Sequence, residues 1–436
     1  MQHTNQDLER PTDTKGDLAT ANPDLAVIAR YRIILGIAVG LLLISVAIIL
    51  MLVFRAGSVD RGTDSTNNQN EMNSGQTAED DSGTNSDVLS PTREEKMIAY
   101  TVENATERNA VCNDGTPAVY FYRPGEGEGI DKWLVWFEGG GGCSSLESCD
   151  KRFEESKYLM SSSASGEGRV KEGGILSADT NDNPDFASWN HVMLNYCSSD
   201  TWMGDAIQTS SEREYIFAGH DIVSAIFKDL SDHNVFSRDL SDASELLVAG
   251  SSAGGSGASH NLNRIVDWFP ELPIKGVIDS SWDPNDTTFT PFPFNDAEVV
   301  AFRGTHLDTY CSEALGTDLL DCVDLDALQP FWQVPVFIYI DQIDKVKLGN
   351  SGITNPSDPA QQAWILDNAE LIRETLEKVE AHFSPAYGQH AVITNDWFND
   401  SKINGISFRE ALGDWYFERT SDTQHEFIYT GEKQTR

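Results

Sequence analysis

From residue 96 onward, short apolar runs alternate with longer amphipathic segments. Runs rich in Val, Ile and aromatic residues predict strands, and they fall at 118–122, 132–137, 191–196, 245–249, 274–278 and 334–340. Helical periodicity predicts helices over 256–268 and 361–383, with part of another at 224–230. Strands that alternate with helices indicate an α/β fold, with a mostly parallel sheet covered by helices on both faces. In such sheets, ligands bind beyond the carboxyl ends of the strands.

The first 95 residues follow a different pattern. Residues 1–32 are mostly polar and predict a disordered tail. Ile33 to Phe54 is an uncharged apolar run of 22 residues. At about 1.5 Å per residue it is long enough to cross a hydrocarbon core of about 30 Å. Residues 55–95 are rich in Ser, Thr, Asn, Gly and acidic residues, which predicts a flexible linker before a folded domain over 96–436.

The apolar run 33–54 has two interpretations, a cleaved signal peptide and an uncleaved signal anchor. The apolar region of a signal peptide is normally about 7–15 residues long, so this run favours a single transmembrane helix. Arg30 and Arg32 precede the run, with Lys15 further off, whereas Arg55 and Arg61 follow it. This slight basic excess favours a cytoplasmic N-terminus. The folded domain would then lie in the periplasm, the lumen or the extracellular space.

Cysteine usage points to the same compartment. All six cysteines lie after residue 95, which predicts disulfides in an oxidising environment. Sequence proximity pairs Cys143 with Cys149 and Cys311 with Cys322, which leaves Cys112 and Cys197. No Cys/His spacing is typical of zinc, so neither a metal site nor a cofactor is expected. The formal net charge of −38 argues against a nucleic-acid partner.

The strand at 245–249 leads into Gly250-Ser-Ser-Ala-Gly254, which matches the pattern G-x-S-x-G. A strand, a turn of small residues and a helix are the context of a nucleophile elbow, which exposes a serine hydroxyl on a strained turn. The alternative is a Gly/Ser-rich surface loop. We identify Ser252 as the candidate nucleophile.

A serine nucleophile needs a base and an acid that orients the base, in the chain order Ser, Asp, His. His390 lies in a loop just past the predicted helix 361–383, where the base is expected, and His425 is a weaker candidate. Asp341 directly follows the strand 334–340 and is the predicted acid. Asp344 and Asp279 are its rivals.

Oxyanion stabilisation requires backbone N–H groups that point at the developing negative charge. One donor is expected from Ala253, the residue after the nucleophile. Another is expected from the glycine-rich segment 137–143, Phe-Glu-Gly-Gly-Gly-Gly-Cys, which follows an early strand.

Together these segments resemble the pectin acetylesterase family, which includes plant pectin acetylesterases and the animal lipid-removing carboxylesterase Notum. The resemblance rests on four features in the same order: 137–143, Asn195-Tyr-Cys-Ser-Ser-Asp-Thr-Trp-Met-Gly204, 250–255, and the pair Asp341 and His390. It covers about residues 100–420. It implies an α/β-hydrolase-like fold, a Ser252–Asp341–His390 triad, and an oxyanion hole formed by the amides of Gly140, Gly141 and Ala253.

The resemblance also implies a function: a membrane-anchored serine carboxylesterase that removes an O-acyl group, such as acetate, from a glycan. Gly141 and Gly142 stand where the family usually has bulky residues, which argues against a long fatty acyl chain. Asp200 and Trp202 are candidate substrate contacts, although Trp202 would equally suit a core or lid position. The alternatives are a lipid or protein O-deacylase like Notum and a catalytically inactive, tethered binding domain.

Overall fold

The computed structural model describes residues 96–164, 170–232, 236, 239–284, 297–316, 319–353, 355–420, 425–431 and 434. The predicted tail 1–32, transmembrane segment 33–54 and linker 55–95 lie outside these ranges. Within the ranges, none of the helices has the length and apolar character needed to cross a membrane. The described residues belong to one compact unit, Val88–Arg436.

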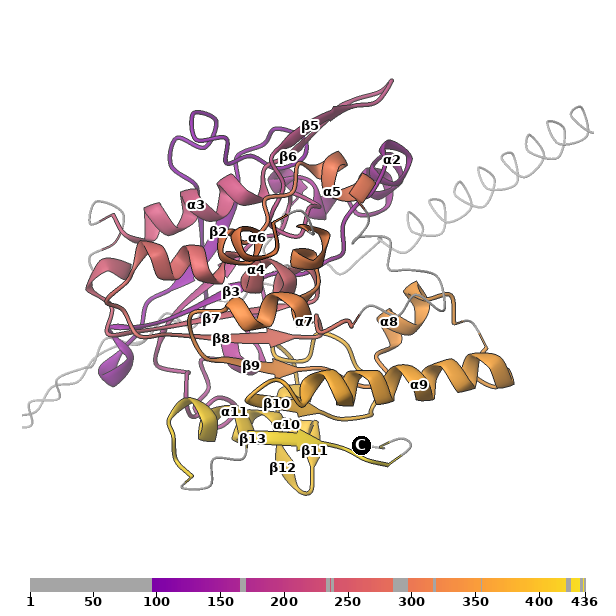
Figure 1. Cartoon of the computed structure of the whole chain (residues 1–436). Helices are drawn as coiled ribbons and strands as arrows, with labels where there is room; N and C mark the ends of the chain where they lie inside the picture. The colour runs from indigo at the N-terminus through magenta and orange to yellow at the C-terminus, as the bar shows by residue number, and fades with distance from the viewer. Residues whose placement is uncertain are drawn as a thin grey trace, which may run out of the picture. The chain divides into compact units, whose positions relative to one another are not determined.

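A nine-stranded sheet runs through this unit (Figure 1). In spatial order the strands are β1 (Ile98–Thr101), β2 (Val119–Arg123), β4 (Asn190–Leu194), β3 (Lys132–Phe137), β7 (Glu245–Ser251), β8 (Ile274–Asp279), β9 (Val336–Tyr339), β10 (Ala381–Ser384) and β13 (His425–Ile428). At one edge β1 pairs with β2, and β2 with β4, in antiparallel fashion, and every later pair of neighbours is parallel. This arrangement confirms the predicted, mostly parallel sheet.

Helices cover both faces of the sheet, as the sequence predicts (Figure 1). One face packs against α3 (Gly219–Leu230), α4 (Ala253–Trp268) and α9 (Pro359–Leu376), and the other against α10 (Trp397–Asp400) and α11 (Phe408–Tyr416). The remaining elements include α2 (Leu146–Glu155), α5 (Ala297–Arg303), α6 (Thr309–Leu315), α7 (Leu325–Leu328), α8 (Lys345–Asn350) and the hairpins β5 (Ala206–Thr209)–β6 (Glu214–Phe217) and β11 (Lys402–Ile403)–β12 (Ile406–Ser407).

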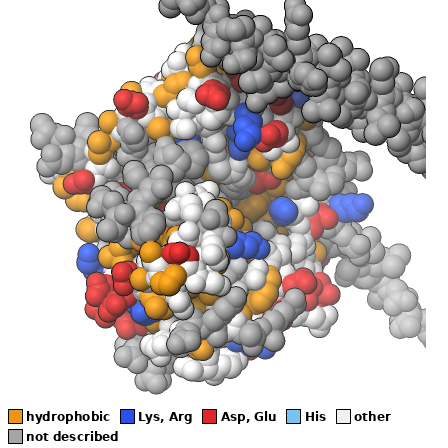
Figure 2. All heavy atoms as spheres, turned by 90° about the vertical axis from the view of Figure 1, so that its right-hand side faces the viewer, with side chains coloured by type: hydrophobic (Ala, Val, Ile, Leu, Met, Phe, Trp, Pro, Cys, Tyr) orange, Lys and Arg blue, Asp and Glu red, His pale blue; other side chains and the backbone are white. Residues whose placement is uncertain are grey.

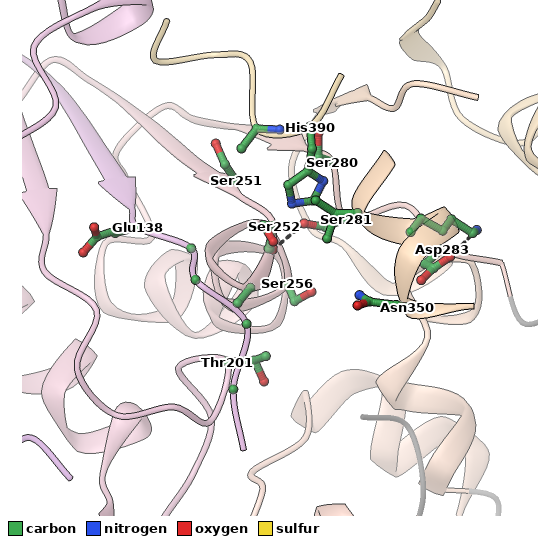
Figure 3. Close-up of a pocket in the computed structure, with 18 of the residues that line it drawn as sticks. Glu138, Thr201, Ser251, Ser252, Ser256, Ser280, Ser281, Asp283, Asn350 and His390 are labelled. Carbon is green, nitrogen blue, oxygen red and sulfur yellow. Dashed lines mark hydrogen bonds and ion pairs between the residues drawn. The ribbon is translucent and has the colours of Figure 1, made fainter. Parts of the chain in front are cut away.

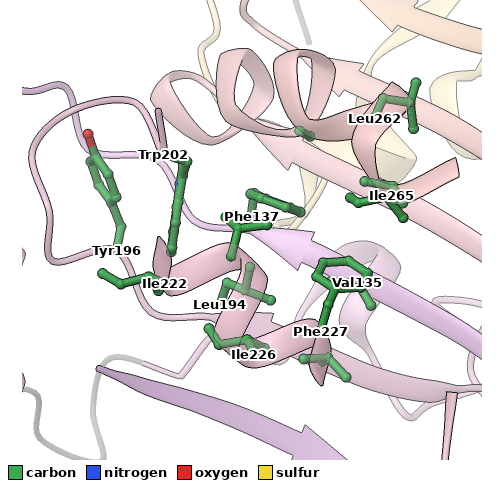
Figure 4. Packing of buried hydrophobic residues seen from close by; sticks show 14 of the residues in the cluster. Val135, Phe137, Leu194, Tyr196, Trp202, Ile222, Ile226, Phe227, Leu262 and Ile265 are labelled. Carbon is green, nitrogen blue, oxygen red and sulfur yellow. The ribbon is translucent and has the colours of Figure 1, made fainter. Parts of the chain in front are cut away.

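Strand β3 shows why the central strands are apolar throughout. Val135 and Phe137 join the core against α3 and α4 (Figure 4), whereas Leu134 and Trp136 join the core on the opposite face. A strand that is buried on both faces has no polar side to alternate with. The same burial explains why the apolar runs of the sequence locate these strands closely.

The predicted helix over 361–383 is wrong at its C-terminal end. Helix α9 begins at Pro359, capped by Asp358, and ends at Leu376, and residues 381–384 form strand β10 instead. His382 therefore lies in a buried strand rather than at a helix terminus. The segment contains neither Gly nor Pro to signal the change, and pairing of β10 with β9 and β13 overrides its helical periodicity.

Three disulfides join the cysteines in the pairing predicted from their spacing, Cys112–Cys197, Cys143–Cys149 and Cys311–Cys322. The first two bear on the site, because Cys143 ends the glycine-rich segment and Cys197 lies in the segment beside it. Each bridge stabilises the fold mainly by restricting the unfolded chain.

Candidate active site

Ser252 occupies the turn between β7 and α4, at the carboxyl edge of the sheet. Its backbone has φ 56° and ψ −130°, a conformation that a non-glycine residue rarely adopts. A Cβ on Gly250 would lie 2.1 Å from the carbonyl oxygen of Gly254, and one on Gly254 would lie 2.0 Å from that of Phe137. Only glycine fits at both positions. The strained turn presents Ser252 as a nucleophile elbow does.

His390 lies in the loop after β10 and forms a hydrogen bond of 2.6 Å from Nδ1 to Oδ2 of Asp344. Burial lowers the pKa of His390, but the hydrogen bond and charge of Asp344, together with the charge of Asp279, outweigh it and raise the pKa above its usual value. A carboxylate that holds Nδ1 leaves Nε2 available for proton transfer.

The prediction that Asp341 orients His390 is wrong, because Asp344 makes that contact. Asp341 is fully buried and accepts backbone N–H groups from Ile343, Tyr387 and Gln389, at 2.9–3.1 Å. Burial raises its pKa to about 6, against the effect of these hydrogen bonds. Asp341 therefore anchors the loop that carries His390.

A second buried carboxylate braces the same loop from β8. Asp279 accepts hydrogen bonds from the hydroxyls of Ser251 and Ser280 and from the backbone N–H of Ile393. The Ser280 hydroxyl in turn accepts from the N–H of Ala391 at 2.9 Å. Burial raises the pKa of Asp279, and its hydrogen bonds partly offset the rise. The loop on both sides of His390 is thus held by the ends of β8 and β9.

The glycine-rich segment after β3 lies against the elbow. A Cβ on Gly139 would lie 2.3 Å from the carbonyl oxygen of Ser251, so the two backbones are in close contact. Gly140 and Gly141 have φ values of 143° and 67°, which favour glycine. Both glycines and Ala253 line the same pocket as Ser252. The residues predicted to donate oxyanion amides are therefore beside the nucleophile.

Asp200 and Trp202, the predicted substrate contacts, are both fully buried and do not line the pocket. The indole N–H of Trp202 donates to the carbonyl of Glu138 at 3.0 Å. Asp200 accepts from the Ser198 hydroxyl and from the N–H groups of Trp202 and Gly219. The prediction of substrate contact is wrong, because these side chains build the scaffold under the glycine-rich segment.

Tyr196 completes this scaffold, which we call the clamp and define as residues 196–202. Its hydroxyl donates to the carbonyl of Gly141 at 2.9 Å and accepts from the N–H of Thr201 at 2.7 Å. Ser199, Thr201 and Trp202 all have positive φ. Such strain persists only where surrounding contacts impose it, and here it lies directly behind the candidate oxyanion segment.

A pocket of about 780 Å³ opens at Ser252. Figure 2 views this side of the molecule and shows a hollow with hydrophobic side chains in its floor and basic side chains beside it. In Figure 3, Glu138 lies on one side of Ser252, and Asp283 and Asn350 lie on the other. The apolar lining of the pocket includes Trp282, Val323, Leu325 and Val346.

Ser252 and His390 both line this pocket (Figure 3), as does Asp344, which is bonded to His390. Between these described residues, no hydrogen bond joins the Ser252 hydroxyl to His390. Such bonds often form fully only when substrate binds. A serine on a strained turn, an imidazole held by a carboxylate and nearby backbone amides are the groups that acyl transfer by a serine requires.

Sequence reasoning missed three contributors to the site. Ser280 was overlooked although the polar run Asp279-Ser-Ser281 directly follows β8, which is the signal that could have found it. The ion pair between Asp283 and Lys347 joins segments 64 residues apart, and no sequence pattern indicates it. Tyr196 was noticed only as part of a motif.

The chain is similar to several known proteins. The chain is 32% identical over 337 residues to palmitoleoyl-protein carboxylesterase notum1a of Danio rerio, over 73% of this chain and 65% of that protein. It is 31% identical to human palmitoleoyl-protein carboxylesterase NOTUM, over 70% of this chain and 64% of the relative. The matches thus cover slightly less than two thirds of these relatives.

A plant protein and a solved structure extend the comparison. Pectin acetylesterase 4 of Arabidopsis thaliana is 28% identical, over 72% of this chain and 82% of its own length. The crystal structure of the Wnt deacylase Notum from Drosophila superposes with a TM-score of 0.69 at 29% identity, covering 77% of this chain and 97% of that one. The family model for pectinacetylesterase matches residues 91–435. The chain therefore belongs to the pectinacetylesterase family.

Proposed function

We propose that the chain is a serine carboxylesterase that hydrolyses an O-acyl ester, with acetate on a glycan as the favoured substrate. The observation that carries the proposal is the 2.6 Å contact of Asp344 with His390, beside an elbow serine in one pocket. Ser252 is the nucleophile, His390 the base and Asp344 the orienting acid.

The reaction follows from these roles. His390 takes the proton of Ser252 through Nε2 while the serine oxygen attacks the ester carbonyl. The amides of Gly140, Gly141 and Ala253 stabilise the negative oxygen of the tetrahedral intermediate. The intermediate collapses to an acyl-enzyme, and His390 returns the proton to the departing alcohol. Water, activated by His390, then releases the acid and restores Ser252.

The direct test measures hydrolysis of a generic acetyl ester by the purified domain and by Ser252→Ala. We expect a loss of about a thousandfold or more, because the nucleophile carries most of the rate enhancement in such triads. Ser256→Ala is a matched control on the first turn of α4. Undiminished hydrolysis by a folded Ser252→Ala variant would refute the proposal.

Two observations favour a second candidate, a lipid or protein O-deacylase. The pocket carries an apolar wall, and two of the relatives named above are palmitoleoyl-protein carboxylesterases. The glycine pair Gly141 and Gly142 and the charged side chains on the same pocket support the short acyl group instead. Rates with acetyl, octanoyl and palmitoleoyl esters separate the two candidates.

A third candidate, an inactive binding domain, makes a different prediction. A fluorophosphonate probe reacts only with an activated serine. Labelling of the wild type but not of Ser252→Ala would exclude inactivity, and absence of labelling in a folded domain would support it.

We also infer that the apolar run 33–54 anchors the domain to a membrane, with the N-terminus inside and the domain on the far side. The inference is supported by the length and uncharged composition of the run. Fractionation of the full chain should place it with membranes and resist extraction by carbonate, and deletion of residues 1–95 should release it. Recovery of the full chain in the soluble fraction would refute the anchor.

A further inference from the structure

A charged pair lines the pocket that contains Ser252. Asp283 follows β8 and Lys347 is on α8, and the two side chains form an ion pair. Both line the pocket, and Asp283 lies on the side of Ser252 away from Glu138 (Figure 3). The Lys347 side chain is 11% exposed and that of Asp283 is 27% exposed.

Apolar and polar side chains both accompany this pair. Trp282 and Val346 directly precede its two members in the chain and line the same pocket, as do Val323, Leu325 and the polar Asn350. Charges taken out of water are costly unless they remain paired and hydrogen-bonded. Asp283 still reaches solvent through the pocket, so part of its charge is hydrated there.

We propose that the Asp283–Lys347 ion pair is a specificity-determining element that selects against long aliphatic acyl groups. A long chain seated along this wall would strip the remaining water from Asp283 without offering a hydrogen bond in return. We expect the shorter acetyl group to leave this water in place. The inference rests on the proposed esterase function and names the substrate class that the site prefers.

The same pair is connected to the base. Oδ1 of Asp344 accepts the backbone N–H of Lys347 at 3.2 Å, while its Oδ2 holds His390. A long acyl group that displaced the Lys347 side chain would also disturb the first turn of α8. It would thereby disturb the Asp344 carboxylate, which orients the His390 imidazole. Long acyl esters should therefore lose kcat as well as gain KM, whereas simple lack of space would chiefly raise KM.

The experiment measures kcat and KM for 4-nitrophenyl acetate, butyrate and octanoate. The test variant is Asp283→Leu with Lys347→Met, which removes both charges at similar volume. We expect the octanoate-to-acetate ratio of kcat/KM to rise at least about tenfold, the scale on which apolar pockets discriminate chain length. Lys347→Met alone should not raise it, because it leaves Asp283 unpaired.

Two controls isolate the effect. Lys347→Arg keeps the ion pair and should keep the ratio. The pair Lys132–Glu245 has an acidic member of similar exposure, 28%, and a more exposed lysine, 26%, and it joins the starts of β3 and β7, away from the pocket. Its removal by Lys132→Met with Glu245→Gln should leave the ratio unchanged.

The inference is overturned if the double pocket variant is folded, labels with fluorophosphonate and shows the wild-type ratio. A wild type that cleaves octanoate faster than acetate would also overturn it. Failure of the proposed function looks different, since no ester of the series would then be cleaved and Ser252 would take no label. That result would refute both the proposed esterase function and the proposed role of the ion pair.

Discussion

Asp344 and His390 are joined by a 2.6 Å hydrogen bond while the second oxygen of the same carboxylate caps α8. A carboxylate that is engaged at both oxygens has no freedom to rotate away from the imidazole. The orientation of the His390 imidazole is therefore fixed by the start of a short helix beside the pocket.

This geometry predicts which aspartate matters for catalysis. Asp344→Asn should lower kcat by about ten-thousandfold, because an amide no longer stabilises the charged imidazole or its tautomer. Asp341→Asn should lower kcat by less than about a hundredfold, since Asp341 acts on the loop backbone. Steady-state kinetics on both variants decide the assignment, and the reverse order of effects would contradict it.

The pH dependence of hydrolysis should follow His390. The base works only when neutral, and its pKa is raised, so kcat/KM should rise with pH with a midpoint above 6.5. Asp344→Asn removes the hydrogen bond and charge that raise the pKa, and its residual activity should show a lower midpoint. If the midpoint is the same in both proteins, the rise of kcat/KM with pH belongs to another group.

Stability should depend on pH through Asp341. Its folded-state pKa of about 6 exceeds the ordinary 3.8, so the folded protein retains a proton that the unfolded chain releases. The free energy of unfolding should therefore fall as pH rises from about 4 to about 6. Denaturant titrations across this window should show a weaker fall in Asp341→Asn, and an unchanged slope would argue against a buried, protonated carboxyl.

The clamp predicts a selective effect on kcat. Tyr196→Phe removes the hydrogen bond to the Gly141 carbonyl and should lower kcat about tenfold or more, with little change in KM. Tyr122→Phe is the matched control, because it removes a buried hydroxyl that donates to Asn190 at 2.8 Å within the sheet. Both variants should lose about 1–3 kcal/mol of stability. Equal kcat in the two variants would show that Tyr196 serves stability alone.

Much of the fold could be predicted from sequence because the central strands are buried on both faces. β3 matches its predicted range, and β7 and β8 each extend past theirs by only one or two residues. The change from α9 to β10 could not be predicted, since it depends on pairing with β9 and β13 rather than on local composition. The formation of edge strand β13 likewise depends on its pairing with β10.

Only part of the site could be predicted from the sequence, for a related reason. The order Ser, Asp, His along the chain predicts that Ser252, His390 and an aspartate after β9 form one site. Two aspartates, Asp341 and Asp344, follow that strand three residues apart. Which of them faces the imidazole depends on the turn between them, where Asp344 becomes a helix cap. For Asp200 and Trp202, polarity and aromatic character suggested ligand contact, whereas complete burial assigns them to the scaffold.

The Cys143–Cys149 bridge ties the end of the glycine-rich segment to α2, and Cys112–Cys197 fixes the clamp behind it. Disulfides are rare in compartments where glutathione keeps thiols reduced. An oxidising compartment is therefore needed for the glycine-rich segment to acquire this covalent brace.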